Sequence, residues 1–277
     1  MKLRLYHHHD GARVAYREAG TGPGVAILHS AMLSHKELEP LVEELAPRFR
    51  VVLPDLPLHG DSEDRPRHPY TLDWLAEVMA GFTREACGPR PLVAGHELGA
   101  EILVRAVGSG RLTPGKLVLM PNCLHRAPLP RRAWRVAARA GALPVLDRAV
   151  AHGAKLMLRP ESGVRLSAQG NPAARDLVRH AVADTGGNAN LARSWAKFAR
   201  TWPSRGGRRE VLEELHRIAC PTLLLWADSD ARHPVAWAEE ALDLLPDGDL
   251  RVVDGTGFLM AYDDPVAVAR EMAAFLV

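Results

Sequence analysis

The chain has 277 residues, 47% of them hydrophobic and 25% charged, which suits one large α/β domain with a sizeable core and excludes an intrinsically disordered chain. Its formal net charge of +2 does not indicate a nucleic-acid partner, and its three scattered cysteines predict neither a disulfide framework nor a zinc site. No apolar run approaches the roughly 20 residues of a membrane span, and no signal peptide opens the chain. We therefore expect a soluble, cytoplasmic globular protein that binds neither membranes nor nucleic acid.

Strand and helix patterns alternate along most of the chain. Residues 2–6 and 13–17 predict a hairpin with a turn at Asp10-Gly11, and the three consecutive histidines 7–9 lie inside this native pattern. The other expected strands are apolar runs at 25–28, 50–53, 91–94, 116–120, 222–227 and 249–253. The expected helices cover 36–47, 71–87, 98–107, 234–245 and 265–276. This alternation predicts a mostly parallel sheet of eight strands, covered by helices on both faces.

A long insertion interrupts the alternation. Residues 124–215 lack strand patterns, and six prolines divide them into short helical segments. Because open α/β sheets bind ligands at the carboxyl ends of their strands, we predict a core of residues 1–123 and 216–277 and a helical lid of residues 124–215 over those ends. Between Arg126 and Arg209, fifteen arginines and two lysines oppose four acidic residues, a net charge of +13. Two interpretations of this charge are open. The basic residues lie on solvated faces of the lid, which is attracted to the rest of the chain with its opposite net charge, or they steer an anionic ligand into the site.

Three segments, each following a predicted strand, carry a family resemblance. They are Leu28-His29-Ser30-Ala31, Pro54-Asp55-Leu56-Pro57-Leu58-His59-Gly60-Asp61-Ser62 and Ala94-Gly95-His96-Glu97-Leu98-Gly99-Ala100. In this order they resemble the α/β-hydrolase family, which has a His-Gly dipeptide with an oxyanion-hole residue, an Asp-x-x-Gly-His-Gly-x-Ser loop and a Gly-x-Ser-x-Gly nucleophile elbow at these places. The resemblance spans essentially the whole chain and implies the α/β-hydrolase fold with an inserted helical lid.

Two positions depart from the family's catalytic triad. Glu97 stands at the place of the nucleophile, and Phe258 stands where the family carries its histidine. By the same resemblance, Asp230 matches the triad acid. Serine-based acyl transfer needs a nucleophile and a base, and since both are replaced, ordinary esterase or lipase chemistry is not expected.

The carboxylate of Glu97 leaves three interpretations open. As a general acid/base beside an oxyanion hole formed by the N–H groups of Ala31 and Leu98, it suits a lyase, isomerase or cyclase acting on a small carbonyl substrate, which the basic lid would allow to be anionic. As a nucleophile or water-activating base it predicts an unusual hydrolase, although Phe258 cannot activate water. The third interpretation is an inactive ligand-binding or scaffolding protein. Against this interpretation, a triad that had lost its function would more easily acquire Ala or Gly at position 97 than an ionisable side chain whose desolvation costs about 1–3 kcal/mol.

The candidate site residues follow from these interpretations. The catalytic candidates are Glu97 and Asp230. The oxyanion-hole and substrate-binding candidates are Ser30, Ala31, His96, Leu98, His125 and Phe258. His233 is considered only as a secondary group near the pocket. Because the sequence contains no metal-ligand spacing and no Gly-rich phosphate loop, we expect no metal and no cofactor, and a small-molecule substrate as the partner.

Overall fold

The computed structural model describes residues 1–124, 126, 161–185, 194–195, 197–198 and 207–277. Eight strands form one sheet in the order β1-β2-β4-β3-β5-β6-β7-β8. They are β1 (Lys2–His7), β2 (Arg13–Ala19), β3 (Gly24–Leu28), β4 (Arg50–Pro54), β5 (Leu92–Gly95), β6 (Lys116–Leu119), β7 (Thr222–Ala227) and β8 (Gly248–Val253). β2 pairs antiparallel with β1 and β4, and every other pairing is parallel. The predicted mostly parallel sheet of eight strands is confirmed.

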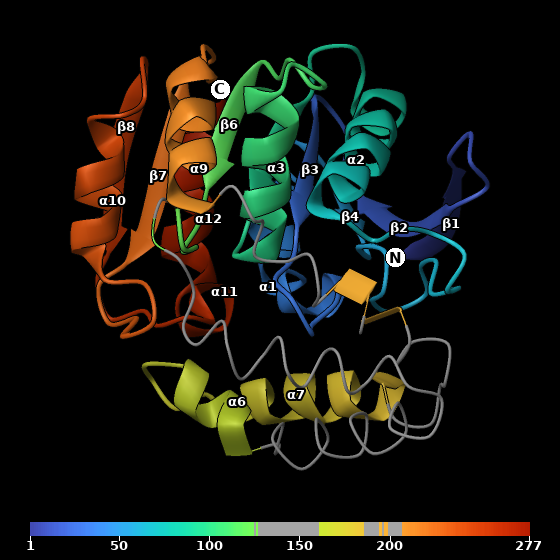
Figure 1. The fold of residues 1–277 in the computed structure, drawn as a ribbon. Helices are drawn as coiled ribbons and strands as arrows, with labels where there is room; N and C mark the ends of the chain where they lie inside the picture. Colours follow the sequence, from blue (N-terminus) through green and yellow to red (C-terminus); the bar gives the residue numbers. More distant parts are fainter. Residues whose placement is uncertain (125, 127–160, 186–193, 196, 199–206) are drawn as a thin grey trace.

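Helices cover both faces of the sheet (Figure 1). One face carries α2 (Leu72–Cys87), α3 (Leu98–Gly108), α9 (Gly207–Arg217) and α10 (Val235–Leu242), and the other carries α1 (Pro40–Leu45), α11 (Met260–Asp263) and α12 (Pro265–Leu276). Successive residues of a strand point to opposite faces, so Ala26 and Leu28 of β3 pack in the first core while Val25 and Ile27 pack in the second. The continuous apolar runs of the sequence are therefore strands that are buried on both sides.

The helix expected over residues 36–47 is shorter and interrupted. A 3₁₀ turn, η1 (His35–Glu37), comes first, and α1 then begins at Pro40. A proline has no backbone N–H and fits only the first turn of a helix. Pro40 therefore starts a new helix here instead of continuing the preceding turn.

Two further helices, α6 (Glu161–Leu166) and α7 (Pro172–Thr185), lie beyond one end of the sheet (Figure 1). Backbone and side chain join them to the loop after β8, because Leu259 N–H donates to the Leu166 carbonyl at 3.0 Å and the Asp263 carboxylate accepts from Ala168 N–H at 2.9 Å. This part of the predicted lid is consequently fixed to the core at the carboxyl end of the sheet.

The predicted end of the lid, residue 215, falls inside α9. This helix packs against α3 through a buried arginine, since Arg105 Nη1 lies 2.5 Å from Glu210 and 2.9 Å from Glu214. Desolvation raises the pKa of the Glu214 carboxyl to about 7 even though Arg105 opposes the shift. The helix α9 thus packs against α3, one of the helices that cover the sheet.

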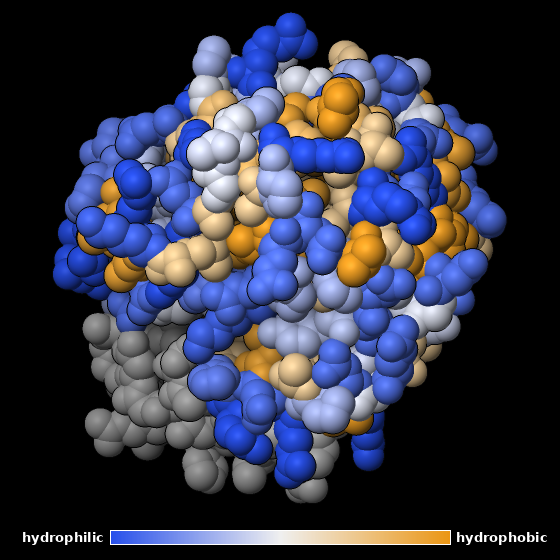
Figure 2. Space-filling model, turned by 180° about the vertical axis from the view of Figure 1, so that it is seen from behind, coloured by the Kyte–Doolittle hydropathy of each residue, from blue (hydrophilic) through white to orange (hydrophobic). Residues whose placement is uncertain are grey.

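Figure 2 shows the face opposite to that of Figure 1, where hydrophilic side chains predominate and hydrophobic groups lie between them. Within the part of the chain that the structure describes, every helix is too short or too polar to cross a lipid bilayer.

Candidate functional site

The turn between β5 and α3 places Glu97 at the carboxyl end of the sheet. Its backbone has φ 44° and ψ −107°, a conformation that is strained for a residue with a side chain. The turn can be this tight because its two flanking residues are glycines, and any side chain there would clash with the backbone. A Cβ on Gly99 would lie 2.4 Å from the Leu28 carbonyl oxygen, and one on Gly95 would lie 2.6 Å from Ala100 N. Close packing of β3, β5 and α3 thus presents the Glu97 side chain at the tip of the turn.

The Glu97 carboxylate lies between two backbone donors. Its Oε2 accepts the N–H of Ala31 at 2.7 Å and the N–H of Leu98 at 2.8 Å, and the residue is 7% exposed. These are the two N–H groups that the sequence analysis expects to form an oxyanion hole, and the start of α3 adds a dipole that favours a negative charge at this place. The side chain of Glu97 therefore satisfies both donors itself.

A second carboxylate, Glu37 of η1, organises the residues around this turn. Its Oε2 accepts from the N–H and hydroxyl of Ser30 at 2.7 and 2.9 Å, and its Oε1 lies 2.5 Å from His96 Nδ1. Burial acts to raise the pKa of Glu37, but the His96 imidazole and the Ser30 N–H outweigh it and hold the pKa below its ordinary value. Ser30 and His96, both candidates for substrate binding, are thus bound to a residue that the sequence analysis missed.

Phe258 has ring contacts with two imidazoles. Its ring centroid is 4.5 Å from that of His96 and 5.9 Å from that of His233, and the Arg232 guanidinium lies 4.5 Å from the ring. His96 Nε2 is buried and has no hydrogen-bond partner among the described residues. The phenyl ring therefore closes the space into which an imidazole at position 258 would extend.

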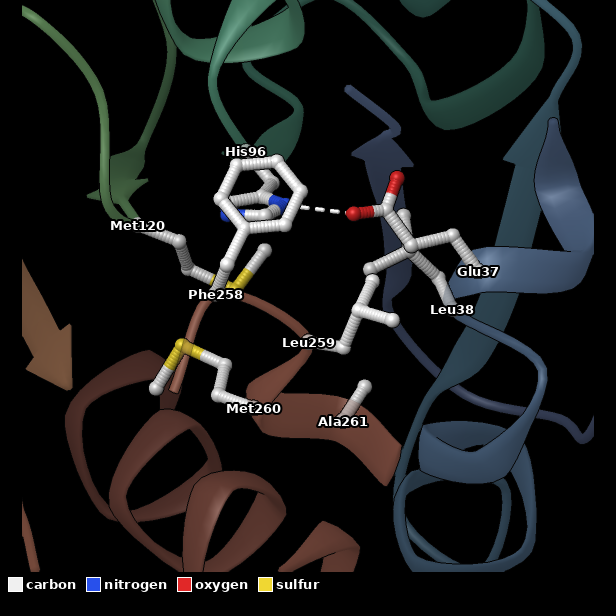
Figure 3. A pocket seen from close by; sticks show the side chains of 8 residues that line it. All are labelled: Glu37, Leu38, His96, Met120, Phe258, Leu259, Met260 and Ala261. Carbon is white, nitrogen blue, oxygen red and sulfur yellow. Dashed lines mark hydrogen bonds and ion pairs between the residues drawn. The ribbon is translucent and has the colours of Figure 1, made fainter. Parts of the chain in front are cut away.

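A small cavity lies beside these rings (Figure 3). It is lined by Glu37, Leu38, His96, Met120, Phe258, Leu259, Met260 and Ala261. Its volume of about 10 Å³ is close to the least that can hold one water molecule. This cavity is too small for an organic substrate, and Glu97 is not among the residues that line it.

Asp230, the match to the triad acid, already has an imidazole partner. Its Oδ2 lies 2.8 Å from His233 Nδ1, and its Oδ1 accepts the Arg232 N–H at 2.8 Å. Burial acts to raise the pKa of Asp230, but His233 and this N–H lower it overall. Asp230 and His233 thus form a second buried pair of carboxylate and imidazole next to Phe258, besides that of Glu37 and His96.

Two neutral histidines support the loop that carries Ala31. His29 Nε2 accepts the Leu56 N–H at 2.9 Å, and His59 Nε2 accepts the Met32 N–H at 3.0 Å. Desolvation lowers the pKa of both, that of His59 to about 3. Each of these imidazoles accepts a backbone N–H and helps to position the loop.

The thiol of Cys123 completes the polar surroundings. Burial, together with the nearby carboxylates of Glu101 and Glu97, raises the pKa of this thiol. A raised pKa keeps the sulfur protonated, so the thiolate that nucleophilic chemistry requires is disfavoured. His125, another candidate, lies outside the described residues.

Comparisons with known proteins agree with this architecture. A model described as "Alpha/beta hydrolase family" matches residues 22–271. An uncharacterized protein of Mycobacterium tuberculosis is 24% identical over 96% of this chain and 77% of its own length. The magnesium-chelatase 30 kDa subunit of Rhodobacter capsulatus is 26% identical over 84% of this chain and 80% of its own length.

Solved structures show the same fold. A thermophilic esterase from Thermogutta terrifontis superposes with a TM-score of 0.79 at 20% identity, covering 100% of this chain and 98% of that one. An enol-lactonase from Burkholderia xenovorans LB400 superposes with a TM-score of 0.77 at 17% identity, covering 99% of each chain. At such low identity these likenesses concern the fold alone.

Proposed function

This chain belongs to the alpha/beta hydrolase family, and we propose that it is a cofactor-free enzyme that uses Glu97 as a general acid/base on a small carbonyl-containing substrate. The reaction class is that of a lyase, isomerase or cyclase. The observation that carries this proposal is the position of the Glu97 carboxylate, 2.7 and 2.8 Å from the N–H groups of Ala31 and Leu98.

The proposed cycle begins when the substrate replaces the carboxylate in the oxyanion hole. The carbonyl oxygen takes the N–H groups of Ala31 and Leu98, and Glu97 is released beside the carbon next to that carbonyl. A carboxylate that has lost two donors is a better proton acceptor, so Glu97 removes a proton from this carbon while the two N–H groups stabilise the enolate. Return of the proton to another carbon gives an isomerase, expulsion of a leaving group gives a lyase, and attack of the enolate on a second carbonyl gives a cyclase.

Hydrolysis at Glu97 would depend on a base other than residue 258. Hydrolysis through an ester on Glu97 would need a base that activates water. Position 258 carries a phenyl ring, and His96 and His233 each direct Nδ1 to a carboxylate, so only the Nε2 atom of either imidazole is left to act as that base. The net charge of +13 between Arg126 and Arg209 supports an anionic substrate, because a basic lid attracts anions to the carboxyl end of the sheet.

A second candidate is a ligand-binding or scaffolding protein without turnover. The bonds from Ala31 and Leu98 to Glu97 favour it, because they already satisfy both of the donors that would hold a substrate oxygen. A third candidate, an unusual hydrolase with Glu97 as nucleophile, predicts a covalent adduct. Incubation with epoxides or alkyl halides, followed by the mass of the intact protein, tests it.

Proton exchange tests the proposed function without knowledge of the final product. The protein is incubated in D₂O with a panel of 2-oxo acids, 3-oxo acids and lactones, and deuterium incorporation next to each carbonyl is followed by proton NMR. We expect the wild type to accelerate exchange for at least one compound. We expect Glu97→Gln, which keeps the shape but removes the base, to be slower by about 10²-fold or more.

Glu101→Gln is the matched control, because Glu101 is a second acid one turn further along α3, whereas the N–H groups of Ala31 and Leu98 donate to Glu97. Exchange that persists undiminished in Glu97→Gln would rule out the acid/base role. A wild type that retains a small molecule in native mass spectra but accelerates no exchange would instead support the binding protein.

A further inference from the structure

A group of metal-ligand side chains lies far along the sheet from Glu97, where the hairpin of β1 and β2 meets α2 (Figure 1). His8 and His9 belong to the turn after β1, and Glu77 belongs to α2. One ligand atom from each of these three residues lies within 4.8 Å of the others. Sequence spacing predicted no metal site, because Glu77 comes from a distant part of the chain.

The imidazole of His8 is held in one orientation. Its Nδ1 lies 2.8 Å from the carboxylate of Asp10, and its side chain is only 4% exposed. Asp10 is fixed in turn, since it accepts the Ala12 N–H at 2.9 Å and the indole N–H of Trp74 at 2.7 Å. Because Nδ1 is engaged by a carboxylate, Nε2 is left as the ligand atom, which is the arrangement found around metal-bound histidines.

The other two side chains complete a set suited to zinc. The rings of His8 and His9 have centroids 4.0 Å apart, and His9 Nε2 lies 3.9 Å from Glu77 Oε1. Ligand atoms around tetrahedral Zn²⁺ are separated by about 3.3 Å, given bonds of about 2.0–2.1 Å. His9 and Glu77 have side chains 74% and 52% exposed, so they have room for the small rotations that would bring the three ligand atoms to this separation.

We propose that His8, His9 and Glu77 form a zinc site, with water as the remaining ligand and Asp10 as the residue that orients His8. Two imidazoles and one carboxylate are a ligand set that Zn²⁺ accepts with an open position. The site would join the turn after β1 to α2, which lie close to each other here, since a Cβ added to Gly81 of α2 would meet His8 Cδ2 at 3.7 Å. Its role would be to clip the edge hairpin to the helix layer.

Zinc titration tests the site. The protein, purified without a polyhistidine tag and kept reduced, is titrated with ZnCl₂ in a calorimeter and melted with and without the metal. We expect one Zn²⁺ per chain and, at a hundredfold excess over Kd, a rise in Tm of about 5 °C. His9→Ala and Glu77→Gln should each weaken binding at least about tenfold and remove most of the rise in Tm.

His7→Ala is the matched control, because it removes an adjacent exposed histidine that is not part of the group. It should bind Zn²⁺ and respond in Tm like the wild type. A wild type without saturable binding would overturn the site. Full binding by His9→Ala and Glu77→Gln, or an equal loss in His7→Ala, would overturn it as well. Both exposed positions allow the variants to fold, which far-ultraviolet circular dichroism checks.

Discussion

The N–H of Ala31 donates to the carboxylate of Glu97 at 2.7 Å, across 66 positions of the sequence. Together with the Leu98 N–H, this bond joins the loop after β3 to the turn after β5. The turn thus combines a strained backbone with a side chain that satisfies two donors, and the two effects oppose each other in the free energy of unfolding.

Two substitutions of Glu97 separate these effects. Glu97→Ala keeps the strained φ of 44° and frees two donors, which should lower the free energy of unfolding by about 1–3 kcal/mol. Glu97→Gly frees the same donors but relieves the strain, so we expect it to be more stable than Glu97→Ala by about 1 kcal/mol. Urea unfolding of both variants measures the difference, and equal stabilities would mean that the turn is not strained.

The same variants should bind small carboxylates. Acetate can take the position that the Glu97 side chain occupies in the wild type, so it should raise the Tm of Glu97→Ala but leave the wild type unchanged. Chloride at the same ionic strength is the control for screening. An equal response of both proteins to acetate would show that the donors are not the binding site.

The packing of Phe258 predicts how serine chemistry could be restored. The backbone of position 97 and both N–H donors are in place, whereas a nucleophile and a base are not. Glu97→Ser combined with Phe258→His should therefore hydrolyse p-nitrophenyl acetate at least about tenfold faster than either single variant.

Adding Asp230→Asn to the double variant tests whether Asp230 orients the new imidazole. Since Asp230 is bound to His233, the new histidine must compete for this carboxylate, and the gain should fall when the carboxylate is removed. Equal rates for the double and single variants would mean that His96 and His233 leave no productive position at 258.

Local patterns explain why the fold could be predicted and most of the site contacts could not. Buried apolar strands and turn motifs can be recognised from residues that are neighbours in the sequence. The helix expected over residues 36–47 was wrong at its start, because the apolar spacing continues across Pro40 although the proline begins a new helix. The bond between Glu37 and His96 spans 59 positions, and no spacing indicates it. His233 is only three residues from Asp230, but the family resemblance placed the expected imidazole partner of Asp230 at position 258.

Acid unfolding should report the pair of Asp230 and His233. Because the pKa of Asp230 is lowered in the folded state, its stabilisation is present above the unfolded pKa of about 3.9 and is lost as the pH falls through the lower folded value. Asp230→Asn should cost about 2 kcal/mol at pH 7 and should lose less stability than the wild type between pH 4 and pH 2. Urea unfolding between pH 2 and pH 7 measures the free energy of unfolding of both proteins, with exposed Asp254→Asn as the control. If the stability of Asp230→Asn and that of the wild type fell in parallel with pH, the proposed stabilisation by ionised Asp230 would be contradicted.

Asp263 should determine how firmly α6 is held to the core. Its carboxylate accepts the N–H groups of Ala168 and Gly257 at 2.9 and 2.7 Å and the hydroxyl of Ser167, so it joins the end of α6 to the loop after β8. Asp263→Ala leaves these donors without an acceptor and should lower the free energy of unfolding by about 3 kcal/mol. It should also speed tryptic cleavage within residues 124–215 under native conditions, because the arginine-rich insertion loses its attachment. Limited proteolysis followed by mass spectrometry measures the rate, with exposed Glu239→Ala as the control for the loss of a charge. Cleavage at the wild-type rate would show that α6 is held by its other contacts, such as the bond from Leu259 to Leu166.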